Sequence, residues 1–134
     1  MSGLKFDKRE LGNLEYSLDR EMLATDRRGG YMSTTIVCCN TRKYHGLMVA
    51  PIDQTERTYV LLSSLDETII QHDQAFNLAL HRFDGVYEPR GHKYITDFEY
   101  TPTPTITYRV GGVVLKKELL WIHNRTQLMI RYTL

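Results

Sequence analysis

The sequence predicts an all-β fold, an antiparallel β-sandwich that opens with a short irregular segment. Runs rich in β-branched residues recur from residue 31 onward. Glycine, asparagine and aspartate separate these runs at intervals typical of sandwiches. Two of the runs are joined by Gly111-Gly112, the pattern of a tight hairpin. About seven or eight strands are therefore expected.

The N-terminal residues, 4–23, are predicted to form an irregular lead-in. Leucines recur there at helical spacing, but Gly12 and Asn13 interrupt the pattern, so we expect one helical turn at most. Residues 26–30 are predicted to form a turn, because paired glycines reach positive φ at little cost.

The middle of the chain is predicted to form strands at residues 31–39, 46–50, 58–70 and 76–83. Pro51 would stop the second of these strands, and alternation in the last one indicates a face in water. Turn signals follow at residues 84–85 and 88–91.

The C-terminal third gives the clearest prediction. Residues 105–110 and 113–122 form a hairpin about the two glycines, and residues 124–125 form the next turn. Residues 127–134 alternate as a final strand. Because the chain stops inside that strand, we expect it to be a fragment of a longer polypeptide.

Composition excludes several classes of protein. With 134 residues the chain suits one domain, and its net charge of +1 argues against nucleic acid or an anionic membrane as partners. No apolar run is long enough to cross a bilayer, and residues 1–11, MSGLKFDKREL, do not have the apolar stretch expected of a secretory signal. The adjacent Cys38 and Cys39 would make a strained bridge, which fits a reducing compartment, so a cytoplasmic location is expected.

Carboxylates are the first candidates for catalysis. Asp66 and Glu67 are neighbours, whereas glycoside hydrolysis needs two carboxyl groups facing each other roughly 5–10 Å apart. Neighbours on a strand face opposite ways, so a polar strand end or a buried ion pair is the preferred interpretation. A self-sufficient enzyme using Asp66, Glu67 or Glu99 remains the alternative that an activity assay would decide.

Other kinds of site find little support. The five histidines lack ligand spacing, and Cys38-Cys39 lacks the intervening residues with which two thiolates hold zinc. Ser63 and Ser64 lack a nucleophile elbow. We therefore expect no metal, no cofactor and no catalytic residue in this chain.

The segment at residues 40–51, NTRKYHGLMVAP, combines cations, rings and a glycine. Arg42 offers a planar fork of donors, and Tyr44 and His45 offer flat faces with polar tips, a combination that suits sugars. In an equally concrete structural interpretation, Arg42 stacks on Tyr44 and a backbone carbonyl satisfies His45. The residues alone leave both interpretations open.

Two segments carry a resemblance to a known family. Residues 21–31, EMLATDRRGGY, and 40–50, NTRKYHGLMVA, resemble the N-terminal domain of bacterial-type glycogen debranching enzymes, the amylo-α-1,6-glucosidases. That family typically shows EWLxTNGxGGYASGT and then NTRRYHGLLVA. Further similarity lies at residues 62–67 (LSSLDE, like the family's LSKLDE), 89–92, Phe98 and 124–134.

The sequence departs from the family pattern at a few positions. Met22 stands where the family usually has tryptophan, and Thr34 and Cys38 stand where glycine is common. Arg27-Arg28 replaces small or apolar residues. We therefore expect the loop before Tyr31 to differ in shape from that of the family.

The resemblance implies a domain organisation. Residues 1–134 would be a single N-terminal β-sandwich, supersandwich-like, with one sheet incomplete and without the catalytic (α/α)6 barrel of the parent. The parent would hydrolyse α-1,6 branch points of glycogen or related α-glucans with carboxylates and no cofactor. The fragment alone is expected to be inactive.

The resemblance also implies a contact surface. Its expected residues are Arg42, Tyr44, His45, Gly46, Tyr31, Asp66 and Glu67. Their partners would be α-glucan, the catalytic barrel of the same polypeptide, or both. A pure docking and folding module without sugar contact is the alternative. An exposed docking face would also lead the fragment to dimerise or to pair through strand edges.

Overall fold

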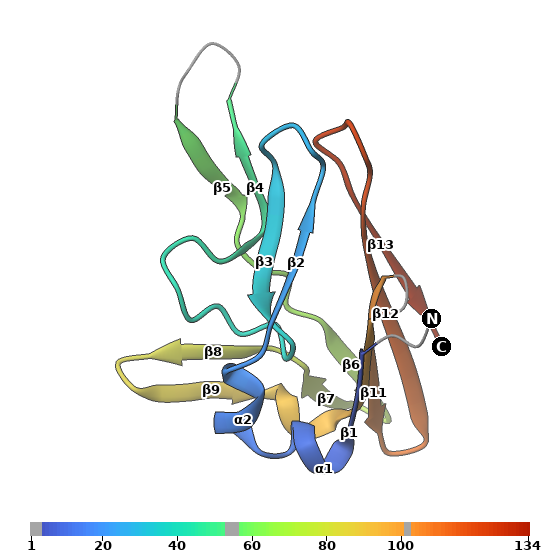
Figure 1. The fold of residues 1–134 in the computed structure, drawn as a ribbon. Coiled ribbons are helices and arrows are strands. Elements are labelled where there is room, and N and C mark those ends of the chain that lie inside the picture. Colours follow the sequence, from blue (N-terminus) through green and yellow to red (C-terminus); the bar gives the residue numbers. More distant parts are fainter. Residues whose placement is uncertain (1–3, 53–56, 101–102) are drawn as a thin grey trace.

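The computed structural model describes residues 4–52, 57–100 and 103–134, and it has the predicted all-β, sandwich-like fold (Figure 1). One sheet has five antiparallel strands in the order β1-β10-β11-β12-β13, and a second has four in the order β2-β3-β4-β5. The first comprises β1 (Leu4–Asp7), β10 (Ile95–Tyr100), β11 (Pro104–Val110), β12 (Val113–Trp121) and β13 (Leu128–Thr133). The second comprises β2 (Glu21–Thr25), β3 (Tyr31–Thr35), β4 (Gly46–Pro51) and β5 (Thr58–Leu62).

Short elements complete the fold. Two hairpins, β6–β7 and β8–β9, lie below the four-stranded sheet in Figure 1. They are β6 (Thr68–Gln71), β7 (Gln74–Asn77), β8 (Leu80–Phe83) and β9 (Val86–Arg90). The helices are α1 (Lys8–Leu11), α2 (Leu14–Leu18) and the 3₁₀ turn η1 (Gly91–Tyr94). In the described segments no helix has both the length and the apolarity that crossing a bilayer would require.

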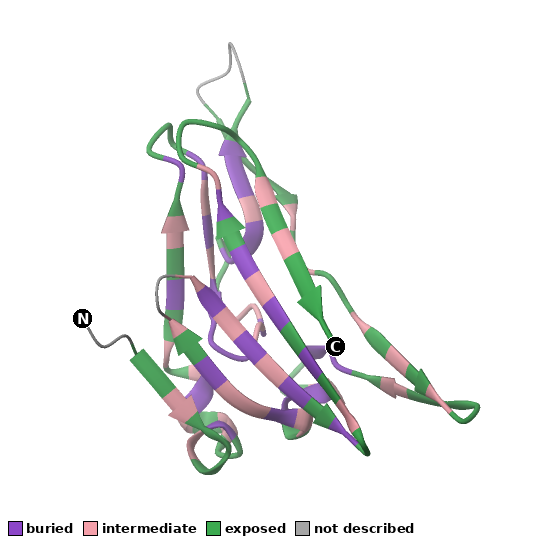
Figure 2. Ribbon diagram, turned by 90° about the vertical axis from the view of Figure 1, so that its right-hand side faces the viewer, coloured by how far each residue is buried: buried purple, intermediate pink, exposed green. Residues whose placement is uncertain are grey.

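The predicted C-terminal hairpin is confirmed. Val110 pairs with Val113 across Gly111-Gly112, and Gly111 has a φ of 57°. Burial alternates along both strands, so one face of the sheet lies in the core and the other faces solvent (Figure 2). This period of two is the pattern that a half-buried strand requires.

The core lies between the two larger sheets. Met22, Met32 and Leu47 contribute from the four-stranded sheet, and Phe98 and Ile106 contribute from the five-stranded sheet. Trp121 joins the sheets directly, because its Nε1–H donates to the carbonyl of Leu47 at 3.2 Å. Burial of large aromatic and aliphatic side chains is the main stabilising contribution here.

The prediction for residues 4–23 was wrong in part. The segment holds β1, α1, α2 and the start of β2. Asn13, which looked like an interruption, is a helix cap whose Oδ1 accepts the backbone N–H of Tyr16 at 3.1 Å. Strand β1 exists because it pairs with β10, with Phe6 opposite Phe98. That partner lies too far along the chain for a local pattern to reveal it.

Three predicted strands were too long. The strand at 31–39 ends at Thr35, whose Oγ1 accepts the N–H of Cys39 at 3.0 Å and donates to its carbonyl at 2.9 Å. Cys38 and Cys39, expected on a strand, therefore lie in a turn, and both are free thiols. The runs at 58–70 and 76–83 each divide into two strands.

The remaining turn predictions gave mixed outcomes. Turns at 26–30, 84–85 and 124–125 are confirmed. The turn at 88–91 was wrong, because β9 continues to Arg90 and η1 follows. Gly91 packs so tightly that a Cβ there would lie 2.1 Å from the Leu78 carbonyl oxygen. The sequence prediction also missed β10.

Candidate functional site

The loop between β3 and β4 borders a surface recess of about 520 Å³. Its lining combines charged, aromatic and small polar side chains: Glu21, Leu23, Tyr31, Ser33, Arg42, Lys43, Tyr44 and His45. Four of the predicted site residues, Arg42, Tyr44, His45 and Tyr31, thus lie together.

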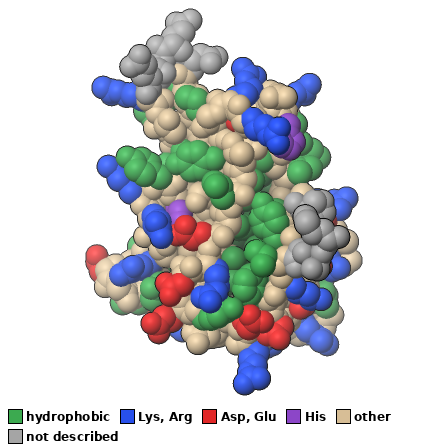
Figure 3. Space-filling view, in the orientation of Figure 1, with side chains coloured by type: hydrophobic (Ala, Val, Ile, Leu, Met, Phe, Trp, Pro, Cys, Tyr) green, Lys and Arg blue, Asp and Glu red, His purple; other side chains and the backbone are tan. Residues whose placement is uncertain are grey.

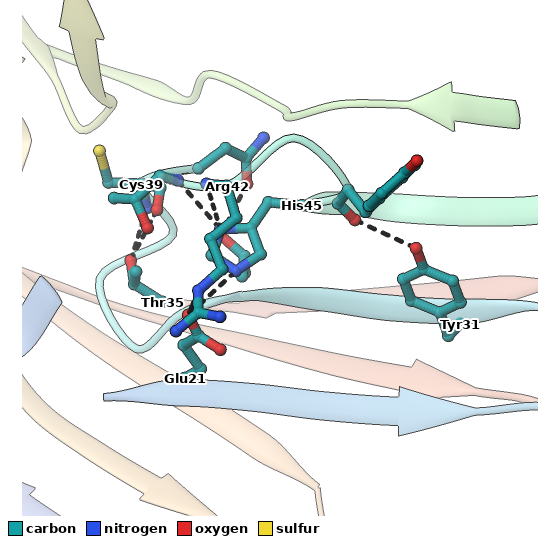
Figure 4. A network of polar contacts seen from close by, with 10 residues as sticks. Glu21, Tyr31, Thr35, Cys39, Arg42 and His45 are labelled. Atoms are coloured by element: carbon teal, nitrogen blue, oxygen red, sulfur yellow. Dashed lines mark hydrogen bonds and ion pairs between the residues drawn. The ribbon is translucent and has the colours of Figure 1, made fainter. Parts of the chain in front are cut away.

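His45 organises this loop from inside. Its buried ring accepts two backbone N–H groups at Nδ1, from Thr41 at 2.9 Å and from Arg42 at 3.3 Å (Figure 4). Both donors need a lone pair, so the imidazole is neutral with its proton on Nε2. The structural interpretation from sequence, in which a carbonyl satisfies His45, was therefore wrong.

The surroundings of His45 favour its neutral form. Burial lowers the pKa of the imidazole, the Glu21 carboxylate opposes that shift, and the Arg42 cation adds to it. Nε2 lies 3.3 Å from Glu21 Oε1, close enough for an ion pair but without hydrogen-bond geometry. His45 is thus a neutral structural group rather than a cation.

Arg42 and Glu21 form an ion pair in the lining of the recess. Arg42 Nε lies 2.6 Å from Glu21 Oε1, and the Arg42 side chain is 72% exposed. The proposed stacking of Arg42 on Tyr44 was wrong, since it is Lys43 whose Nζ lies 5.5 Å from the Tyr44 ring centroid. Sequence reasoning missed Glu21 as a site residue. The available signal was its place at the start of the first segment that resembles the family.

Two tyrosines form the aromatic part of the recess. The Tyr31 hydroxyl donates to the Tyr44 carbonyl at 3.3 Å, which ties β3 to the loop (Figure 4). The Tyr44 side chain itself is exposed, at 61%. The Tyr44 ring therefore presents an apolar face to solvent beside the recess.

Gly46 closes the loop where it enters β4. A Cβ there would lie 2.9 Å from Val60 Cγ1 and 3.0 Å from Val49 Cγ2. The close approach that glycine permits is therefore between β4 and β5 inside the sheet. Asn40 fixes the other end of the loop, because its Nδ2 donates to the Ser63 carbonyl at 3.0 Å.

Asp66 and Glu67 do not line the recess. Asp66 lies 2.9 Å from His81 Nε2, on β8. Glu67 Oε1 lies 2.5 Å from Lys117 Nζ, on β12, in a pair that is largely buried. The structure separates these two acids from the loop residues and gives each its own side-chain partner.

Lys117 keeps its charge although it is buried. Burial alone would lower the pKa of Lys117, but the neighbouring Glu67, which also accepts a hydrogen bond from Lys117 Nζ, outweighs it, so the pKa lies above its ordinary value. Burial raises the pKa of Cys38, which keeps that thiol protonated. Lys117 is therefore an ammonium at neutral pH, held against the Glu67 side chain. Across the described ranges, no group of three or more His, Cys, Asp or Glu side chains is arranged to hold a metal ion.

Comparison with known proteins adds the family. The family model described as glycogen debranching enzyme N terminal matches residues 20–134, a span that contains every residue of the recess. Curated proteins and solved structures gave no match. Because the family model covers most of the 134 residues, the chain belongs to the family of glycogen debranching enzyme N-terminal domains.

Proposed function

We propose that residues 1–134 form one non-catalytic domain of a cytoplasmic glycogen debranching enzyme, which contacts α-glucan through the recess at Tyr44. Further polypeptide would supply the catalytic (α/α)6 barrel, and the whole enzyme would hydrolyse α-1,6 branch points of glycogen or related α-glucans. The domain supports that barrel and holds a glucan chain near it.

The exposed Tyr44 ring beside the Glu21–Arg42 pair carries this proposal. A glucose unit presents an apolar C–H face and a rim of hydroxyls. The Tyr44 ring can stack on the C–H face of the sugar. The Glu21 carboxylate offers an acceptor and the Arg42 guanidinium offers donors to the sugar hydroxyls. A guanidinium has more donors than its contact with Glu21 occupies.

A non-catalytic role agrees with the placement of the acids. Asp66 contacts His81 and Glu67 contacts Lys117, on different strands, so the two acids do not face one another across a cleft. Hydrolysis of a glycosidic bond requires two such opposed carboxyl groups.

A second candidate, an interdomain docking module without sugar contact, is favoured by a neighbouring apolar surface. Figure 3 shows hydrophobic side chains in a band between β2 and the five-stranded sheet. A recess of about 240 Å³ lies there, and Phe6, Leu23 and Tyr100 contribute to its lining. Exposed apolar patches of this kind mark protein contacts.

Native electrophoresis in gels with and without glycogen separates the two candidates. Glycogen in the gel should retard the chain, and Tyr44→Ala should abolish that retardation. Phe83→Ala, which removes an exposed ring on β8, is the matched control and should be retarded like the wild type.

Unretarded migration of the wild type, or equal loss in both variants, would contradict the glucan contact and leave the docking role. Incubating the purified chain with pullulan and limit dextrin tests the other half of the proposal. Release of reducing sugar by this chain would overturn the non-catalytic assignment.

A further inference from the structure

A second recess, which we call the α2 recess, lies between α2 and the β8–β9 hairpin and has a volume of about 410 Å³. Figure 1 places α2 beside that hairpin, below the loop between β3 and β4. The lining of the α2 recess includes Glu15, Leu18, Asp19, Thr41, Arg82 and Tyr87. The family match begins at residue 20, after α2, so it does not describe this wall of the recess. The volume lies within the range of small-molecule sites, about 300–1,000 Å³.

The α2 recess adjoins the recess at Tyr44 along two segments of the chain. Thr41 lines the α2 recess, and the next residue, Arg42, lines the recess at Tyr44. Asp19 lines the α2 recess, and Glu21, two residues further on, lines the other. Because one residue advances the chain by at most about 3.6 Å, the lining positions in each segment lie within about 7 Å of each other. The two recesses therefore meet at the Glu21–Arg42 ion pair, where a linear ligand can cross from one to the other.

A buried donor near this junction has no acceptor. His45 carries its proton on Nε2, and its side chain is only 3% exposed. Nε2 forms no hydrogen bond within the described residues, although it lies 3.3 Å from Glu21 Oε1. A buried N–H without an acceptor costs free energy. A ligand hydroxyl placed here can accept from Nε2 and donate to Glu21, so the junction favours a ligand rich in hydroxyl groups.

The α2 recess repeats the groups of the recess at Tyr44, namely a tyrosine ring, a guanidinium and carboxylates. Arg82 and Tyr87 lie opposite each other in the β8–β9 hairpin, so both side chains project from one face of it. Glu15 and Asp19 are four residues apart, which places them on one side of α2. A tyrosine ring packs on the C–H face of a sugar, and the charged groups hydrogen-bond its hydroxyls. The same class of ligand therefore suits both recesses.

The charged groups of the α2 recess are available to a ligand. Within the described ranges, Glu15, Asp19 and Arg82 form neither a salt bridge nor a side-chain hydrogen bond. All three are exposed. An acid at the C-terminal end of a helix is unfavourable, and so are like charges four residues apart. The helix α2 itself therefore gives no reason for its two acids.

We propose that the α2 recess is a second glucan subsite, and that one α-glucan chain lies across both recesses and over the ion pair between them. This subsite rests on the proposed function, since it extends the glucan contact at Tyr44 to an adjoining position. In the α2 recess the Tyr87 ring packs against a glucose unit, Arg82 donates to the sugar hydroxyls, and the two carboxylates accept from them. Binding therefore strengthens with the length of the glucan until both recesses are filled.

Titration of the whole chain with maltotriose and with maltoheptaose, followed by amide chemical shifts, tests this subsite. Maltoheptaose should shift residues 41–45 together with residues 15–19, Arg82 and Tyr87, and it should bind more tightly than maltotriose. Arg82→Ala removes a charged donor and should raise the dissociation constant for maltoheptaose at least about tenfold. Maltotriose, which we expect in the recess at Tyr44, should bind this variant as it binds the wild type.

Arg90→Ala is the matched control, because Arg90 is an exposed arginine of the same hairpin and lines neither recess. It should bind both sugars like the wild type. Glu15→Gln tests the opposite wall at an exposed position, with a side chain of nearly the same size. It should raise the dissociation constant for maltoheptaose alone.

Maltoheptaose shifts confined to the recess at Tyr44 would overturn the second subsite and leave the proposed function standing. So would unchanged maltoheptaose binding in both Arg82→Ala and Glu15→Gln, or equal weakening by Arg82→Ala and Arg90→Ala. Equal weakening of maltotriose and maltoheptaose by Arg82→Ala would also overturn it, because that result indicates a change in the recess at Tyr44. If neither sugar shifted either recess, the proposed function would fail together with the subsite.

Discussion

Two glutamate–cation pairs in this molecule have the same chemistry and opposite surroundings. Glu67 and Lys117 are 16% and 2% exposed, and they join the segment before β6 to β12. Glu21 and Arg42 are 31% and 72% exposed, and they join β2 to the loop between β3 and β4. The first pair is removed from water, whereas the second borders a recess that opens to it.

Because the two pairs differ in burial, they have different roles in the molecule. A charge that has left water needs its partner, so loss of either member of a buried pair is strongly destabilising. An exposed pair contributes little to stability because water screens it. The Glu67–Lys117 pair therefore belongs to the fold, and the Glu21–Arg42 pair is available for contact with a ligand.

The largest effect should come from Glu67→Gln. It leaves the buried Lys117 ammonium without a counter-charge and should cost about 3–5 kcal/mol of stability. Urea unfolding followed by the fluorescence of Trp121, the single tryptophan, measures it. Asp66→Asn is the control, with an expected loss of about 0–1 kcal/mol. A loss below about 1 kcal/mol for Glu67→Gln would contradict the distinction between the pairs.

His45→Ala should have the next largest effect. It leaves the N–H groups of Thr41 and Arg42 without their acceptor, at a cost of about 1–3 kcal/mol. His45→Asn should recover part of this loss, because the asparagine oxygen reaches the position of Nδ1. The same unfolding assay applies. If the His45→Ala and His45→Asn variants were equally stable, the acceptor role assigned to His45 Nδ1 would be wrong.

Acid should weaken the fold through the buried histidines. Burial lowers the pKa of His45 and of His92 in the folded chain below the ordinary 6.5. Between the folded and the unfolded pKa of each histidine, the unfolded chain therefore binds a proton that the folded chain does not. Their contribution to stability is full above pH 6.5 and is lost as the pH falls below it. Unfolding measured at about pH 7.5 and about pH 5.5 should show the decrease, with a smaller slope in His45→Asn. Stability that rose towards acid would contradict this account.

Arg42→Ala should have the smallest effect on stability, about 0–1 kcal/mol. It should nevertheless reduce retardation by glycogen, because the guanidinium supplies donors to the recess. Arg42→Lys keeps the charge without the fork and should restore only part of the binding. If Arg42→Ala lost stability but was still retarded by glycogen, the roles assigned to the two pairs would have to be reversed.

Local patterns were sufficient to predict part of the fold. The β11–β12 hairpin was predicted because its alternation and its two glycines lie within one short segment. Strand β1 was not predicted, because it depends on distant β10: Phe6 and Phe98 meet only when the sheet assembles. Turn chemistry such as the Thr35–Cys39 hydrogen bonds likewise ended a strand that β-branched residues would have continued.

The residues of the candidate site were likewise predicted only in part. Composition alone indicated Arg42, Tyr44 and His45, since they lie in one segment of four residues. Glu21 was missed because its approach to Arg42 depends on the pairing of β2 with β3, in which Glu21 lies opposite Thr35. Asp66 and Glu67 were grouped with the loop by their resemblance to a family segment, and side-chain partners on β8 and β12 separate them from it.

Amide chemical-shift mapping during titration with maltoheptaose tests the central claim most directly. The account predicts that shifts change at residues 41–45 and at Tyr31, around the Glu21–Arg42 pair, and stay constant at Glu67 and Lys117. Tyr44→Ala should remove the response. Unchanged shifts throughout at saturating sugar, or changes centred on the buried pair, would contradict the claim that the exposed pair is the glucan contact.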